Sequence, residues 1–290
     1  MSKNAKRDDE IRKSVRESYA KRATSCKSGC GGSCCSESAP PVSKVIGYSD
    51  DELRSIPQGA DLGLGCGHPT ALASLKKGEV VLDLGSGAGI DCFLAVDKVG
   101  PTGRAVGVDM TPEMIERARE NARREGIENV EFRLGEIEHL PIADGSVDVI
   151  VSNCVINLSP DKPQVFREAF RALKRGGRLM VSDIVLRGEL PKEIQESMEQ
   201  YVGCVAGASQ IDDYLGAIRD AGFRDVTVVK ETSAESAFSC GEAEKLGEKG
   251  TLKLVVDGQA LRLEDVGLTD QTAHLLAATV SSISVSATKP

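Results

Sequence analysis

The chain has 290 residues, 40% of them hydrophobic and 28% charged, and 36 Lys and Arg against 44 Asp and Glu give a formal net charge of −8. This length predicts one or two domains, and the acidic balance disfavours a general nucleic-acid or anionic-membrane binder. No apolar run reaches the roughly 18 residues of a membrane span, and the N-terminus lacks the apolar region of a secretory signal. We expect a cytoplasmic protein that binds small molecules.

The cysteine content favours thiol chemistry. There are nine cysteines, an odd number that excludes a fully paired disulfide framework. In a reducing compartment most of them are expected to be reduced. Binding of a soft metal or metalloid is therefore a hypothesis to test along the chain.

The N-terminal segment, residues 1–47, is expected to hold a helix and a loop. Ile11, Val15 and Tyr19 recur at helical spacing within residues 8–22, although a frayed polar tail is an alternative reading. Residues 26–43 are rich in Cys, Gly and Ser, which is typical of a loop.

The segment 48–231 has the pattern of an α/β core. Ser49 and Glu52 have the spacing of a capping box at the start of a short helix. The apolar runs that predict core strands are residues 80–85, 105–110, 130–135, 147–153 and 177–183. The helical stretches are residues 90–99, 112–125, 162–174, 191–203 and 210–221. Continuous apolar strands alternating with helices predict a doubly wound, mostly parallel α/β sheet.

The C-terminal region, residues 232–290, is expected to add strands to this core. Residues 225–231 and 281–289 resemble closing strands. Between them lie a helical candidate at 233–247 and a hairpin candidate beginning at Thr251.

A glycine-rich turn after the first core strand predicts a cofactor site. Asp83 is followed by Gly85, Gly87 and Gly89, which allow a tight turn and close approach of a ligand to the backbone. Asp109 ends the next strand about 20 residues later, where an acid can accept hydrogen bonds from both ribose hydroxyls. The spacing differs from the dinucleotide fingerprint, so the combination indicates a nucleoside ligand of another kind.

These residues resemble the class I S-adenosylmethionine-dependent methyltransferases. The resemblance implies that the glycine loop holds the methionine part of the cofactor, and that Asp109, followed by Met110, binds the ribose. It also implies that Glu136 and Ile137 contact the adenine, and that Asn153 ends the fourth strand beside the methyl group. The alternative is that the glycines only pack a helix against a strand and that Asp109 is an ordinary strand-end acid.

Three cysteines far apart in the sequence have contexts that suggest chemistry: Cys66, Cys154 and Cys204. For each one alone, a buried structural thiol is the competing interpretation. None of the three belongs to a close pair of the kind that zinc sites use. Cys92 is expected to pack in the core, and His68 to make a surface hydrogen bond.

Around these cysteines the chain resembles the arsenite methyltransferases over residues 10–230. The most specific segment is Ser-Asn-Cys-Val-Ile-Asn-Leu at residues 152–158, and others are Gly-Leu-Gly-Cys-Gly at 63–67 and Gly-Cys at 203–204. The resemblance implies that Cys66, Cys154 and Cys204 bind trivalent arsenic, with Cys34 or Cys35 as a further participant. It also implies arsenite and methylarsenite as substrates, a thiol reductant of the thioredoxin or glutathione type as partner, and a role in arsenic detoxification.

The chemistry agrees with this interpretation. Thiolates select soft centres such as As(III), and the arsenic lone pair can attack a sulfonium methyl without a general base. A methyltransferase for a quinone or another small organic acceptor would not need the three cysteines. A metalloid-binding buffer or sensor would not need the cofactor loop. The sequence therefore favours an arsenite methyltransferase over both alternatives.

Overall fold

The computed structural model describes residues 3–25, 42–190, 205–233, 253–256, 259–262 and 278–290. The helices expected at 191–203 and 233–247, and most of the Cys-rich loop, lie outside these residues. So do Cys34, Cys35 and Cys204.

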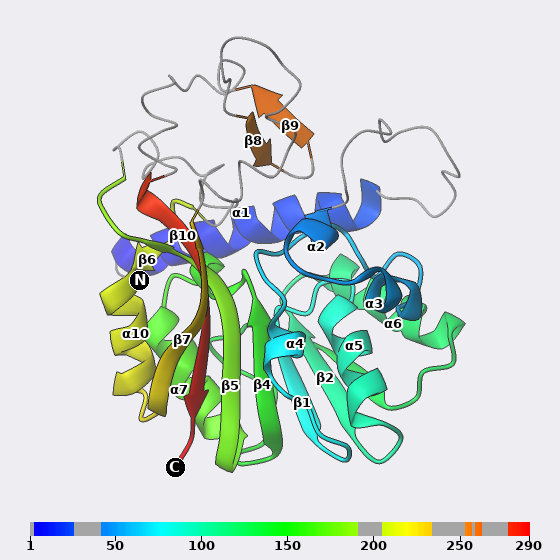
Figure 1. Ribbon diagram of the computed structural model, residues 1–290. Helices are drawn as coiled ribbons and strands as arrows, with labels where there is room; N and C mark the ends of the chain where they lie inside the picture. The colour runs from blue at the N-terminus through cyan, green and yellow to red at the C-terminus, as the bar shows by residue number, and fades with distance from the viewer. Residues whose placement is uncertain (1–2, 26–41, 191–204, 234–252, 257–258, 263–277) are drawn as a thin grey trace.

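One mixed sheet forms the centre of the molecule (Figure 1). Its strands run in the order β3-β2-β1-β4-β5-β10-β7, and the first five pair in parallel while β10 is antiparallel to β5 and β7. Their bounds are β1 Val80–Leu84, β2 Arg104–Asp109, β3 Val130–Leu134, β4 Val147–Asn153, β5 Leu173–Leu186, β7 Arg224–Ser233 and β10 Val280–Thr288. The short β6, Ser209–Gln210, pairs with β5. The predicted doubly wound, mostly parallel fold is confirmed.

Helices cover both faces of this sheet, as continuous apolar strands require. Alternate residues of β1 show the two faces: Val81 belongs to the cluster that includes Phe93 of α5, whereas Leu82 and Leu84 belong to the cluster that includes Phe166 of α7. The covering helices are α5 Ile90–Val99 and α6 Pro112–Arg124 on one face, and α7 Lys162–Ala172 and α10 Ile211–Asp220 on the other. The remaining elements are α2 Val42–Val45, α3 Asp50–Ser55, α4 Pro69–Leu72, the 3₁₀ helix η1 Ile156–Leu158, and the hairpin strands β8 Lys253–Val256 and β9 Gln259–Arg262.

The N-terminal helix α1, Lys3–Ser25, crosses the molecule at the ends of the strands (Figure 1). The helical interpretation is confirmed, and the helix is longer than the predicted stretch. Ile11 and Val15 are 7% and 1% exposed and cluster with Leu158, and Met110 and Cys154 pack against this cluster. The apolar stripe of α1 therefore covers the edge of the sheet at which the strands β2 and β4 end.

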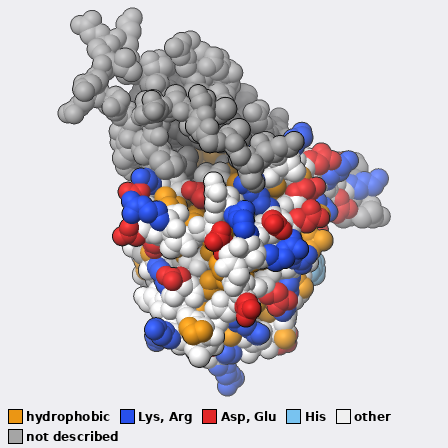
Figure 2. Space-filling model, turned by 90° about the vertical axis from the view of Figure 1, so that its right-hand side faces the viewer, with side chains coloured by type: hydrophobic (Ala, Val, Ile, Leu, Met, Phe, Trp, Pro, Cys, Tyr) orange, Lys and Arg blue, Asp and Glu red, His pale blue; other side chains and the backbone are white. Residues whose placement is uncertain are grey.

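Local signals read from the sequence also hold in detail. Ser49 caps α3 in a full capping box with Glu52, and β8 pairs with β9 as an antiparallel hairpin. Figure 2 shows Lys and Arg side chains interspersed with Asp and Glu on one face of the molecule. Within the described part of the chain, no helix combines the length and apolar character needed to cross a membrane.

The division at residues 47/48 and 231/232 stays a prediction, although strand β7 runs across the second boundary and β10 completes the same sheet.

Candidate active site

The glycine loop between β1 and α5 folds against the neighbouring strand. The N–H groups of Gly85 and Ser86 donate to the carbonyl of Val108 at 2.8 and 3.0 Å. Gly85, Gly87 and Gly89 have φ angles of 73°, 51° and 100°, in the left-handed region that side chains with a Cβ rarely adopt. The sequence places glycine where this turn requires it, at the carboxyl edge where open α/β sheets bind ligands.

Asp109 joins this loop to the end of β2. One carboxylate oxygen accepts the Gly87 N–H at 2.9 Å, and the other accepts the Thr111 N–H at 2.8 Å. Burial raises the pKa of Asp109, while these two hydrogen bonds act in the opposite direction. The carboxylate that is expected to bind ribose therefore also holds the glycine loop in place.

The surroundings of the loop fit a nucleoside cofactor. The space where Gly87 would carry a Cβ has no atom within 4 Å, so the backbone is open to a ligand there. The Ser86 hydroxyl is buried and has no hydrogen-bond partner among the described residues. An open backbone and an unsatisfied hydroxyl at the same turn are what a polar ligand would complete.

Two buried acids lie behind the loop. Asp83 is 3% exposed, accepts a hydrogen bond from the Cys92 thiol at 3.5 Å, and has its pKa raised well above the usual value by burial. Asp91 of α5 is equally buried and accepts hydrogen bonds from Tyr48 and Thr70. The expectation that Cys92 packs in the core is confirmed, because its side chain has no exposed surface.

Two of the residues expected at the ribose and adenine, Met110 and Glu136, lie next to helix α1. Ile137 is 8% exposed, and Met110 packs on the apolar stripe of α1. The Arg12 guanidinium of α1 lies 3.7 Å from the Glu136 carboxylate and 3.3 Å from that of Glu138. The roles of these residues in cofactor binding stay predictions, but the helix that covers them was not assigned to the site from the sequence.

Asn153, at the end of β4, fastens the segment that carries Cys66. Its side-chain oxygen accepts the N–H groups of Cys66 and Gly67 at 3.0 and 3.2 Å, and its amide donates to the Gly67 carbonyl at 2.8 Å. The amide also donates to the Tyr48 hydroxyl at 3.0 Å. The side chain of Asn153 therefore holds the backbone of Cys66 and Gly67 in place by hydrogen bonds, a role that the sequence does not predict.

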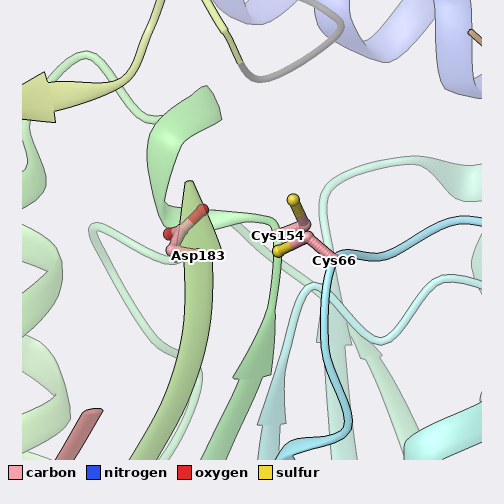
Figure 3. A group of neighbouring side chains, drawn as sticks. All are labelled: Cys66, Cys154 and Asp183. Atoms are coloured by element: carbon pink, nitrogen blue, oxygen red, sulfur yellow. The ribbon is translucent and has the colours of Figure 1, made fainter. Parts of the chain in front are cut away.

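Cys66, Cys154 and Asp183 form one group of side chains (Figure 3). Their two sulfur atoms and a carboxylate oxygen lie within 4.8 Å of one another. The Cys154 N–H and the Cys66 thiol both donate to the Ser182 carbonyl, at 2.8 and 3.5 Å. Cys154 has φ 59°, an uncommon backbone conformation for a residue with a side chain. Two cysteines that are far apart in sequence thus meet at the carboxyl edges of β4 and β5.

Asp183 is the member of this group that the sequence did not reveal. It is 1% exposed, and its carboxylate accepts hydrogen bonds from the Tyr214 hydroxyl at 3.1 Å and from the Ile184 N–H at 3.1 Å. Burial raises the pKa of this carboxyl group from 3.8 to about 7. An acid that follows the apolar run of β5 was a signal of the same kind as Asp109.

The structure changes one minor expectation. His68 does not make a surface hydrogen bond: it is 7% exposed, stacks against Tyr48 at 4.1 Å between ring centroids, and lies 3.2 Å from the Gly47 carbonyl. The roles expected for Cys34, Cys35 and Cys204 concern residues outside the described part of the chain and stay predictions.

Asp183 makes a pH-dependent contribution to stability that a single substitution can isolate. The pKa of Asp183 is about 7 in the folded protein and 3.8 without burial. Between these two pH values the carboxyl group is protonated in the folded state and ionised in the unfolded state, so the folded state loses stability as the pH rises from about 4 to about 7. The displacement corresponds to at most about 4 kcal/mol. We expect Asp183→Asn to unfold like the parent near pH 4 and to be more stable above pH 7. Denaturant unfolding of both proteins across this range measures the difference, and a constant difference would contradict the assignment.

The chain is similar in sequence to known methyltransferases. Residues 75–222 match a family described as a methyltransferase domain. An arsenite methyltransferase of Halobacterium salinarum is 49% identical over 251 residues, which are 83% of this chain and 64% of that protein. The human arsenite methyltransferase is 37% identical over 217 residues, which are 70% and 56% of the two chains.

A solved structure gives the same result. The arsenic(III) S-adenosylmethionine methyltransferase of Chlamydomonas reinhardtii superposes with a TM-score of 0.59 at 30% identity, covering 87% of this chain and 75% of that chain. The chain belongs to the methyltransferase domain family. Within that family, the expected resemblance to arsenite methyltransferases is confirmed. The chain spans about three fifths of the length of these curated relatives.

Asp109 provides a direct test of the cofactor site. If Asp109 binds the ribose as the resemblance predicts, Asp109→Ala should remove charge-assisted hydrogen bonds to the cofactor, and cofactor affinity should fall by roughly tenfold to a hundredfold, or about 1.5 to 3 kcal/mol. Arsenite binding should persist, because the two described cysteines lie at the ends of other elements. Calorimetric titration with S-adenosylmethionine measures the loss. Unchanged cofactor affinity in a folded variant would remove Asp109 from the site.

Proposed function

We propose that this protein transfers a methyl group from S-adenosylmethionine to trivalent arsenic, first to arsenite and then to methylarsenite. The observation that carries the proposal is that Cys66 and Cys154 lie in one group, with the residue after Cys154 packed against the cofactor loop. Val155, the residue after Cys154, lies so close to Gly85 that a Cβ there would stand 2.3 Å from its side chain. The thiols and the turn that would hold the methyl donor thus share one edge of the sheet.

The cysteines would load the substrate by exchanging ligands. Each thiol that replaces an arsenic-bound hydroxide forms an As–S bond and gives its proton to the departing hydroxide, which leaves as water. Sulfur ligands suit As(III), and three of them leave its lone pair available. Cys204 and one of Cys34 and Cys35 are our candidates for the sulfur beyond Cys66 and Cys154.

The protein's part in the transfer step would be chiefly orientation and exclusion of water. S-adenosylmethionine, when bound, supplies an electrophilic methyl group on a sulfonium sulfur. The arsenic lone pair would attack that methyl, with S-adenosylhomocysteine as the leaving group. Forming the As–C bond takes arsenic formally from +3 to +5, so two electrons from the thiol reductant proposed below would have to return it to +3 before methylarsenite could serve as the next substrate. No proton has to leave the nucleophile, so this step needs no general base. Asn153 would support the geometry by holding the Cys66 segment against the end of β4.

The arrangement in the chain follows from these roles. Residues 48–231 would form the cofactor-binding core, residues 1–47 would supply the covering helix and further thiols, and residues 232–290 would close the sheet. A thiol reductant of the thioredoxin or glutathione type is the partner that we propose for turnover, and we propose that the reaction takes place in the cytoplasm.

The test is a direct search for methylated arsenic. The full chain is incubated with arsenite, S-adenosylmethionine labelled in its methyl group, and a dithiol, and the arsenic products are then separated. We expect the label in methylarsenic, and no label in a quinone acceptor offered in place of arsenite. Transfer to the quinone but not to arsenite would favour the organic-acceptor alternative. Arsenite binding without any transfer would favour a metalloid-binding protein.

A further inference from the structure

In the group formed by Cys66, Cys154 and Asp183, the carboxylate of Asp183 is not a ligand that trivalent arsenic needs. Trivalent arsenic is held by sulfur, but a buried carboxylate completes the described group. Two sulfurs and one carboxylate oxygen are instead a donor set used by borderline divalent cations, of which Zn²⁺ is the usual case.

We propose that Cys66, Cys154 and Asp183 form a three-ligand site for a divalent cation of the Zn²⁺ class. Binding of this ion would be a property separate from the methylation reaction, because Zn²⁺ has no lone pair that could attack a methyl group. The expected competition between the cation and arsenite for the two sulfurs rests on the proposed function. Binding of the cation to the three side chains does not depend on that function.

The geometry is close to what such an ion requires. Zn–S bonds of about 2.3 Å and Zn–O bonds of about 2.0 to 2.2 Å put tetrahedral ligands roughly 3.4 to 3.8 Å apart. The three ligand atoms in the structure lie within 4.8 Å of one another, so side-chain shifts of about 1 Å would bring them to the separations of a tetrahedral zinc site. Three protein ligands also leave a fourth position open, as in zinc sites that exchange a ligand.

The surroundings of the carboxylate favour this role. The Tyr214 hydroxyl and the Ile184 N–H both donate to it and hold it in one orientation, as hydrogen-bond donors around metal ligands do. Asp183 is 1% exposed, and an adjacent dication would stabilise the charged form of a carboxyl group buried in this way. The two thiols would each release a proton when the ion binds.

This site could not be predicted from the sequence, because zinc ligands are usually recognised by their close spacing. Here three segments supply one ligand each: Cys66 precedes α4, Cys154 follows β4, and Asp183 lies in β5. The fold, and not a local motif, assembles the group.

Co²⁺ is the probe for the test, because thiolate ligation gives it a charge-transfer absorption and four-coordination gives it intense visible bands. The full chain is reduced, freed of metal and titrated with Co²⁺, and Zn²⁺ is then used to displace it. Because Cys26, Cys30, Cys34 and Cys35 are also thiols, the same titration is made with all four replaced by serine. We expect both proteins to show the bands of one thiolate-bound ion.

The variants then identify the ligands. Cys66→Ser and Cys154→Ser should lose the bands, and Asp183→Asn should weaken Co²⁺ binding by roughly tenfold to a hundredfold or more. Cys92→Ser is the matched control, since Cys92 is a buried thiol outside the group and should leave the bands unchanged. Bands that vanish with the four N-terminal cysteines, or that persist unchanged in Asp183→Asn and Cys154→Ser, would overturn the proposal. Circular dichroism confirms that each variant is folded.

The two proposals fail in different ways. If arsenite is not methylated but Co²⁺ binds as described, only the proposed function is wrong. If arsenite is methylated and Co²⁺ does not bind in this group, only the metal site is wrong. Where both stand, Zn²⁺ should inhibit arsenite methylation competitively, with an inhibition constant at least about tenfold weaker in Asp183→Asn.

Discussion

Cys154→Ser is expected to lose methyl transfer to both arsenite and methylarsenite, by about a hundredfold or more. Cys154 directly follows strand β4, and its sulfur is one of the two that the described group brings together. Arsenite has three exchangeable positions, whereas methylarsenite has one fixed carbon and only two. We assign Cys154 and Cys204 to the second substrate and Cys66 to the additional position of the first.

Cys66→Ser therefore should lose methylation of arsenite and retain much of the methylation of methylarsenite, and Cys204→Ser should lose both. The measurement is product speciation for each variant with each substrate, after cofactor binding and folding are confirmed. If Cys66→Ser abolishes both reactions equally, or Cys204→Ser performs both normally, this division of the thiols is wrong.

Gly85→Ala is expected to destabilise the fold by about 2 to 5 kcal/mol. Gly85 has φ 73°, and an added Cβ would stand 2.3 Å from the side chain of Val155. Strain in the left-handed region and a clash with a neighbouring side chain thus add up. The loss is measured by denaturant unfolding in the absence of cofactor.

Gly87→Ala is the matched control, because Gly87 also has a positive φ, of 51°, but nothing within 4 Å of the added Cβ. It should cost only about 1 kcal/mol. Adding Val155→Ala to Gly85→Ala should recover part of the larger loss, since it removes the two Cγ atoms nearest to the added Cβ and leaves only the Val155 Cβ, at 2.8 Å. Equal losses for the two alanine variants would show that the packing of Val155 on the loop does not matter.

The elements of the core could be predicted because their signals are local. The apolar runs became the strands β1 to β5, the glycines became the turn after β1, and Asp109 lies beside that turn. Each of these features depends on a few neighbouring residues and on the rule that parallel strands present their carboxyl ends at one edge. Membership of the methyltransferase family is consistent with them.

The assembly of the candidate site depends on contacts between distant segments, which the sequence does not order. The apolar stripe of α1 predicts a helix but does not say that it covers Met110 and Cys154. The side chain of Asn153 is a strand-end polar group in the sequence, and only the fold shows it bonded to the Cys66 segment. Asp183 could not be assigned to the site from the sequence, because only the fold brings its carboxylate next to Cys66 and Cys154.

The most direct test of the account is X-ray absorption at the arsenic edge for the full chain loaded with one equivalent of arsenite. We predict a first shell made of sulfur, and the loss of sulfur neighbours in the double variant Cys66→Ser/Cys154→Ser. A shell made of oxygen in the parent protein, or a sulfur shell that is unchanged in the double variant, would contradict the claim that these two cysteines hold the substrate.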